Sequence, residues 1–209
     1  MIALESGEFL VCHLSLLFQK NYAISLFYHS LTFSYNVGMK VILTMAISAN
    51  GIIATKTGSE DFLSHDNWLR FVKLAKKVGC FIWGRKTYEA VIKWEGDYLK
   101  ELEGVKKLII SRSRLKLING FESANSPEEA LSKLAESGFK EVIITGGSTI
   151  NSSFAKAGLI DEVIFDVNPS ILGEGIPVFT PDNFELSMDL VGVEKIGNNL
   201  VEIHYKVKK

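Results

Sequence analysis

The sequence predicts an α/β sandwich: a three-layer α/β/α fold with a mainly parallel sheet and a C-terminal antiparallel hairpin. Three observations lead to this prediction. Short apolar runs typical of buried strands alternate with amphipathic helical patterns along most of the chain. The helical patterns are bounded by capping residues and glycines. The chain closes on two strand patterns within residues 184–207, joined at the hairpin signal Gly197-Asn198-Asn199.

The composition is that of one ordinary globular domain. The chain has 209 residues, 47% hydrophobic and 22% charged, and this length supports a core without further cross-links. A net charge of −1 gives no electrostatic basis for binding nucleic acid or an anionic membrane, so we expect neither as a partner. Cys12 and Cys80 are too few for a disulfide framework and fit a reducing, cytoplasmic compartment, with Cys80 a buried thiol. The four histidines have no ligand-like spacing, so we expect no metal.

The first 38 residues differ from the rest of the chain. They are rich in aromatic side chains, and their charged groups are Glu5, Glu8 and Lys20. Their apolar runs are interrupted and fall short of the roughly 18 residues of a membrane span. The two acids also argue against the basic first region of a secretory signal. We therefore predict that residues 1–38 are an extension outside the fold, that Met39 is the functional start, and that residues 39–209 form one domain.

The first elements after Met39 are a strand and a helix. The continuous apolar run of residues 41–47 predicts a buried strand, and Asn50-Gly51 indicates a turn with positive φ. An amphipathic helix follows, with Ser64 or Asp66 as its cap and Gly79 as its end.

The next two predicted strands end in residues suited to phosphate. Residues 80–83 form a buried strand that is followed at once by Gly84-Arg85-Lys86-Thr87. Cations at a helix start oppose the helix dipole, which favours a bound anion over the simpler alternative of a solvated helix start. The strand of residues 107–110 ends in Ser111-Arg112, whose hydroxyl and guanidinium groups bind phosphate well.

The third strand end of this kind is reached after a helix that begins at Ser126-Pro127. A β-branched run of residues 143–145 passes through Gly146-Gly147 into Ser148-Thr149 at the start of another helix, and residues 162–167 form the next strand. Glycines let the backbone approach a ligand, and the free N–H groups and dipole of the helix start attract an anion. Taken alone, this pattern is equally compatible with a tight strand-to-helix turn.

Three such strand ends on one edge of a sheet indicate a nucleotide with several phosphates. The three spaced glycines of the usual dinucleotide fingerprint are absent after the first strand, which argues against an ordinary Rossmann fold.

In this order the motifs resemble the dihydrofolate reductase-like superfamily. The nearer branch is the C-terminal reductase domain of the bifunctional riboflavin-biosynthesis deaminase-reductase. The resemblance covers residues 39–206 and is more specific for the fold and for NADPH than for the substrate. The segments that carry it are residues 48–54, 84–89, 146–147, 158–162 and 169–179.

The resemblance implies an NADPH site. A cis peptide joins the glycine pair in dihydrofolate reductases, and we expect the same between Gly146 and Gly147. The implied contacts are Ala46, Asn50, Gly51 and Ile53 beside the nicotinamide, Gly84, Arg85, Lys86 and Thr87 on the pyrophosphate and adenosine side, Ser111 and Arg112 at the 2′-phosphate, and Gly146, Gly147, Ser148 and Thr149 around the pyrophosphate.

Two positions depart from the patterns of these families. Dihydrofolate reductases place a carboxylate four residues before a phenylalanine of the first helix, whereas counting back from Phe71 gives Asn67, with Asp66 one residue away. A shifted helix start would bring Asp66 into the pocket, and the alternative is that Asp66 only caps the helix. Riboflavin reductases usually have Glu before the glycine pair, where this chain has Thr145. The candidate catalytic residues are Asn50, Asp66 and Asn67.

We therefore expect an NADPH-dependent reductase of a small pyrimidine or pterin substrate. The preferred reaction is that of a 5-amino-6-(5-phosphoribosylamino)uracil reductase, in which a ribose carbonyl becomes a ribityl alcohol in riboflavin biosynthesis. One alternative is dihydrofolate reductase. The other is a nucleotide-binding protein without reductase chemistry, because Asn67 and Thr145 stand where the two families have a carboxylate. The resemblance also implies a homodimer.

Overall fold

The computed structural model describes residues 38–209. The predicted extension therefore lies, apart from Gly38, outside the described residues, and its assignment stays a prediction. Within the described part of the chain, no helix is both long and apolar enough to cross a membrane.

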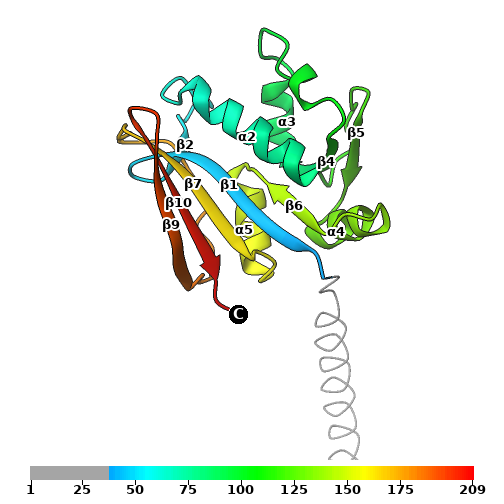
Figure 1. Cartoon of the computed structure of the whole chain (residues 1–209). Helices are drawn as coiled ribbons and strands as arrows, with labels where there is room; N and C mark the ends of the chain where they lie inside the picture. The colour runs from blue at the N-terminus through cyan, green and yellow to red at the C-terminus, as the bar shows by residue number, and fades with distance from the viewer. Residues whose placement is uncertain (1–37) are drawn as a thin grey trace, which may run out of the picture. The chain divides into compact units, whose positions relative to one another are not determined.

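An eight-stranded sheet with the order β5-β4-β3-β6-β1-β7-β10-β9 forms the centre of the fold (Figure 1). Every neighbouring pair from β5 to β7 is parallel, and β10 runs antiparallel to both β7 and β9. This confirms the predicted mainly parallel sheet with its C-terminal hairpin. The strands are β1 (Lys40–Ser48), β3 (Cys80–Gly84), β4 (Lys106–Ile110), β5 (Phe121–Ala124), β6 (Glu141–Ile144), β7 (Glu162–Asn168), β9 (Met188–Ile196) and β10 (Leu200–Val207).

Helices cover both faces of the sheet, which confirms the three layers. One face packs against α2 (His65–Val78) and α3 (Arg85–Val91), and the other packs against α4 (Pro127–Glu136) and α5 (Ser148–Lys156) (Figure 1). A short 3-10 helix, η1 (Lys100–Leu102), adds to the α2 side, and β2 (Ile52–Ala54) pairs antiparallel with β8 (Ile176–Pro177) in a small second sheet.

Capping groups place the helix starts. The residue before α2 is Ser64, whose N–H donates to Asn67 Oδ1 (3.0 Å), and Gly79 ends the helix with φ of +88°. Ser126 Oγ accepts from Glu129 N–H (3.2 Å) at the start of α4. The cap of α2 is therefore Ser64, and the alternative that Asp66 caps this helix is wrong, because Asp66 lies inside the first turn.

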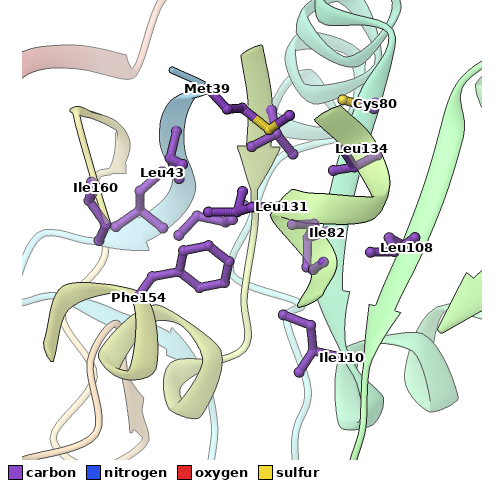
Figure 2. Packing of buried hydrophobic residues seen from close by; sticks show 14 of the residues in the cluster. Met39, Leu43, Cys80, Ile82, Leu108, Ile110, Leu131, Leu134, Phe154 and Ile160 are labelled. Atoms are coloured by element: carbon purple, nitrogen blue, oxygen red, sulfur yellow. The ribbon is translucent and has the colours of Figure 1, made fainter. Parts of the chain in front are cut away.

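Two apolar clusters hold the layers together because side chains alternate along each strand. Phe81 and Trp83 of β3 face α2 and α3, whereas Cys80 and Ile82 of the same strand face α4 and α5. Figure 2 shows the second cluster, in which Phe154 of α5 is fully buried. Burial raises the pKa of the Cys80 thiol to about 12, in agreement with the predicted buried free cysteine.

The strand β5 was not predicted from the sequence. Its four residues alternate as buried, exposed, exposed and buried, and the two central ones, Glu122 and Ser123, are polar. As an edge strand it needs no continuous apolar run, so a pattern search has little to find.

Candidate active site

The three predicted phosphate-binding strand ends lie side by side, because β4, β3 and β6 are consecutive strands of one parallel sheet. Gly84, at the end of β3, donates its N–H to the carbonyl oxygen of Gly146 (2.8 Å). Thr145 donates its N–H to the carbonyl oxygen of Ile82 (3.2 Å). The two glycine turns are thus joined directly through their backbones.

The glycine pair forms the floor of a narrow notch beside Thr87 and Met45. A methyl group added to Gly147 would lie 3.4 Å from Thr87 Oγ1, and one added to Gly146 would lie 3.3 Å from the Met45 thioether. Gly146 also has φ of +82°, which strongly favours glycine. The peptide bond between the two glycines is cis, as the resemblance implied. A turn that carries no side chains lets a phosphate group approach the backbone closely.

The hydroxyl group of Ser148, which was predicted to lie near the pyrophosphate, is used within the fold. Ser148 is buried, and its Oγ lies 2.9 Å from Thr180 Oγ1. Ser152 Oγ donates to the Thr180 carbonyl oxygen (2.9 Å), so these side chains tie α5 to the segment around Thr180. Thr149 is exposed.

The predicted cationic contacts lie at the outer surface beyond β3 and β4. Arg85 is exposed and pairs with Glu89 one turn along α3 (3.0 Å). Lys86 and Arg112 are exposed, and neither forms an ion pair with any of residues 38–209. The neighbouring Ser111 hydroxyl donates to the Ser113 carbonyl oxygen (2.9 Å) and shapes the turn that presents Arg112.

A cleft of about 1170 Å³ opens between α2 and the sheet and reaches the glycine pair. All three tryptophans of the chain line it. Of the predicted site residues it brings together Ala46, Ile53, Asn67, Thr87, Gly146 and Gly147. The remaining predicted residues do not line it: Asn50, Gly51, Asp66, Gly84, Arg85, Lys86, Ser111, Arg112, Ser148 and Thr149.

Two predicted catalytic residues lie outside the cleft. Asp66 is exposed in the first turn of α2, so the idea that a shifted helix start brings it into the pocket is wrong. Asn50 is also exposed, and both ends of its amide are used by the protein. Its Nδ2 donates to the Leu172 carbonyl oxygen (2.7 Å), and its Oδ1 accepts from Ser48 Oγ (2.8 Å). Asn50 fastens the turn after β1 rather than facing the cleft.

A partly buried charge cluster in the cleft was not predicted from the sequence. Arg70 of α2 places its Nε 3.1 Å from both carboxylate oxygens of Asp166 on β7, and its Nη2 pairs with Glu202 on β10. Asp166 is 6% exposed, and burial raises the pKa of its carboxyl while Arg70 opposes that rise. An aspartate inside the apolar run of residues 162–167 was the available signal.

Glu60, on the loop after β2, also lines the cleft. Desolvation by the surrounding protein raises the pKa of its carboxyl to about 7, although the residue as a whole is exposed to solvent. A carboxyl with this pKa holds a proton in a large share of molecules near neutral pH, as a proton donor requires.

Comparison with known proteins places this geometry among reductase domains. The sequence model described as "RibD C-terminal domain" matches residues 39–201. Uncharacterized protein YyaP of Bacillus subtilis (strain 168) is 25% identical over 177 residues, which is 79% of this chain and 94% of YyaP. The riboflavin biosynthesis protein RibD of Corynebacterium ammoniagenes is 41% identical over 59 residues, which is 28% of this chain and 18% of that protein.

Solved structures show the same fold. A candidate riboflavin biosynthesis protein from Shewanella sp. PV-4 has a TM-score of 0.68 and 25% identity, and the match covers 82% of this chain and 100% of that one. The dihydrofolate reductase of Enterococcus faecalis, complexed with NADP(H), has a TM-score of 0.63 and 17% identity, with coverage of 82% and 98%. The second similarity shows the fold alone.

Proposed function

The chain belongs to the RibD C-terminal domain family, and from this premise we propose that it is an NADPH-dependent reductase of a pyrimidine substrate. The preferred substrate is 5-amino-6-(5-phosphoribosylamino)uracil. The observation that supports this most is that three phosphate-suited strand ends are neighbours on one sheet edge, and that two of them reach the cleft through Thr87 and the Gly146-Gly147 pair. The alternatives are dihydrofolate reductase and a nucleotide-binding protein without reductase chemistry.

The residues at this edge fit a dinucleotide phosphate. The Gly146-Gly147 backbone offers a notch that a side chain would fill, and Lys86 and Arg112 supply cationic groups nearby. Ala46 and Ile53, farther into the cleft, would form the apolar wall beside the nicotinamide. When bound, the reduced nicotinamide supplies a hydride to the carbonyl carbon of the substrate. The protein's part is to hold the two reactants together, exclude water and deliver one proton to the carbonyl oxygen.

We propose Glu60 as the donor of that proton, because it lines the same cleft and the pKa of its carboxyl is raised. Replacing Glu60 with Gln is expected to lower kcat by about 10²-fold or more, because the amide cannot release a proton. In the natural protein kcat should fall as pH rises through about 7, since the protonated carboxyl is the active form. The Glu60→Gln variant should lose this limb of the pH profile. A variant that keeps the limb would show that another group supplies the proton.

Loss of nicotinamide absorbance on mixing the protein, NADPH and each substrate tests the reaction itself. Turnover of the ribosylaminopyrimidine supports the proposal. Turnover of dihydrofolate alone supports the first alternative. NADPH binding without oxidation in the presence of either substrate supports the second alternative.

Arg112 is the group proposed to select NADPH over NADH. Replacing Arg112 with Ala should weaken NADPH binding by about 10-fold or more, because a guanidinium–phosphate contact is a strong, charge-assisted one. NADH lacks the 2′-phosphate, so its dissociation constant should change little. Titrating both cofactors into both proteins measures the difference, and equal weakening of the two would remove the 2′-phosphate role from Arg112.

A homodimer is also proposed, through the edge strand β9. Leu190, Val191 and Val193 of this strand are between 57% and 60% exposed, which is unusual for an apolar stretch that faces only water. A second copy of the chain could cover these side chains and pair the open strand edge. Light scattering on the eluted protein gives the mass that decides between one and two copies.

A further inference from the structure

Asn67 presents a buried amide donor in the cleft, and the protein fixes the orientation of this amide. Its Oδ1 accepts from both the N–H (3.0 Å) and the hydroxyl (3.3 Å) of Ser64, and this fixes which end of the amide is oxygen. The opposite end, Nδ2, is buried and has no hydrogen-bond partner of good geometry among residues 38–209. Asn67 is 7% exposed and lines the cleft. The nearby Asp166 carboxylate can accept from at most one of the two N–H groups of Nδ2, so an acceptor on a bound ligand would satisfy the other.

Asp166 presents an acceptor at the same place. Its carboxylate lies near the Asn67 amide, which contributes to lowering the pKa of Asp166 against the effect of burial. Arg70 holds the carboxylate through a single nitrogen, Nε, at 3.1 Å from each oxygen. A carboxylate can accept about four hydrogen bonds, so this contact leaves room for a ligand.

The sheet register places this pair beside the proposed hydride-transfer position. Asp166 on β7 is directly opposite Ala46 on β1, and both line the cleft. Ala46 is one of the residues expected next to the nicotinamide. A substrate ring held by Asp166 would therefore lie next to the place where reduction occurs.

We propose that Asp166 and Asn67 together bind the lactam edge of the substrate's heterocycle. Asp166 accepts a hydrogen bond from the ring N3–H, and Asn67 Nδ2 donates to the adjacent ring carbonyl. This inference rests on the proposed function and deepens it, because it names the chemical group by which the substrate is recognised. It requires a ring with an unsubstituted N–H next to a C=O, as in uracil derivatives.

The ligand-side test uses 5,6-diaminouracil and its N3-methyl derivative as probes on the full chain. Trp68, Trp83 and Trp94 line the cleft, so their fluorescence reports binding. The natural protein should bind the methylated probe about 10- to 100-fold more weakly, because the methyl group replaces the N–H that would donate to Asp166. Equal binding of the two probes overturns the proposal, and this measurement requires no variant.

Protein variants separate the two halves of the pair. Asp166→Asn should bind the parent probe about 10- to 100-fold more weakly and should discriminate less than about 3-fold between the probes. Asn67→Ser, which shortens the donor, should weaken both probes by the same factor, because both keep the carbonyl. Asp161→Asn is the matched control: Asp161 lies outside the cleft, where its carboxylate accepts from Val41 N–H (2.8 Å). It should leave the discrimination unchanged.

The outcomes distinguish this inference from the proposed function. If Asp166→Asn still discriminates fully, the methyl group acts by bulk alone and the lactam contact is overturned. NADPH oxidation is followed in the same samples with the ribosylaminopyrimidine. NADPH oxidation without discrimination between the two probes overturns the lactam contact and still supports the proposed reductase function. Discrimination without oxidation supports the lactam contact and overturns the reductase.

Discussion

Replacing Arg70 with Met is expected to lower the free energy of unfolding by about 2–4 kcal/mol near neutral pH. Arg70 lies between two acids, Asp166 and Glu202, and the exposed fractions of these three side chains are 27%, 9% and 23%. Methionine fills a similar volume but leaves two carboxylates close together with no cation between them. The partial exposure of Arg70 keeps the estimate below the cost of a fully buried pair.

The size of this loss should depend on pH. Burial already raises the pKa of Asp166, and Arg70 opposes the rise. Without Arg70, the pKa of Asp166 should rise further above its value in an unfolded chain. The native variant then binds more protons than the unfolded chain over this range, so its stability falls as pH rises. The deficit relative to the natural protein should therefore be smaller near pH 5 than near pH 7.

Urea denaturation of both proteins at the two pH values measures this change. His204 pairs with Glu162 in the same cleft (3.2 Å), but this pair is common to both proteins and largely cancels in the difference. Lys100→Met is the control, because Lys100 and Asp97 form a fully solvated pair and the change should cost less than about 0.5 kcal/mol. A deficit in Arg70→Met that is the same at both pH values would contradict the role given to the two acids.

Local sequence signals were sufficient for most of the fold. Apolar runs located β1, β3 and β4, Gly79 marked the end of α2, and Ser126 marked the start of α4. These signals are local because capping groups and buried strands depend on residues close in sequence. The edge strand β5 carries no such signal and was missed.

The site was harder to predict because it depends on pairing between distant segments. The sequence indicates three phosphate-suited turns, but only the strand order β4-β3-β6 makes them neighbours. Asp166 lies on β7, a central strand with buried residues on both of its faces. Only its pairing with Ala46 of β1 and Glu202 of β10 shows that the side chain faces the cleft. The wrong placement of Asp66 has the same origin. Neighbouring residues of α2 point in different directions, so Asn67 faces the cleft and Asp66 faces water.

The close approach of two strand ends gives the second large prediction, for Gly84→Ala. A methyl group at Gly84 would lie 2.7 Å from Ile150 Cγ1 of α5 and 3.5 Å from the Gly147 nitrogen. Gly84 has φ of −78°, which alanine adopts freely, so the expected effect is steric. Overpacking of this kind costs about 1–3 kcal/mol of stability.

The same change should weaken NADPH binding by about 10-fold or more if the glycine notch holds the pyrophosphate, because small displacements of preorganised groups are costly. Gly192→Ala is the control, since a methyl group at Gly192 on β9 would meet no atom within 4 Å. Thermal unfolding with and without NADPH measures both effects, because a ligand that binds the native state raises its melting temperature. Gly84→Ala should lose stability and most of the NADPH-dependent shift, whereas Gly192→Ala should keep both. A Gly84→Ala protein that is destabilised but retains the full NADPH-dependent shift would contradict the proposal that the turn beside Gly84 and Ile150 holds the pyrophosphate.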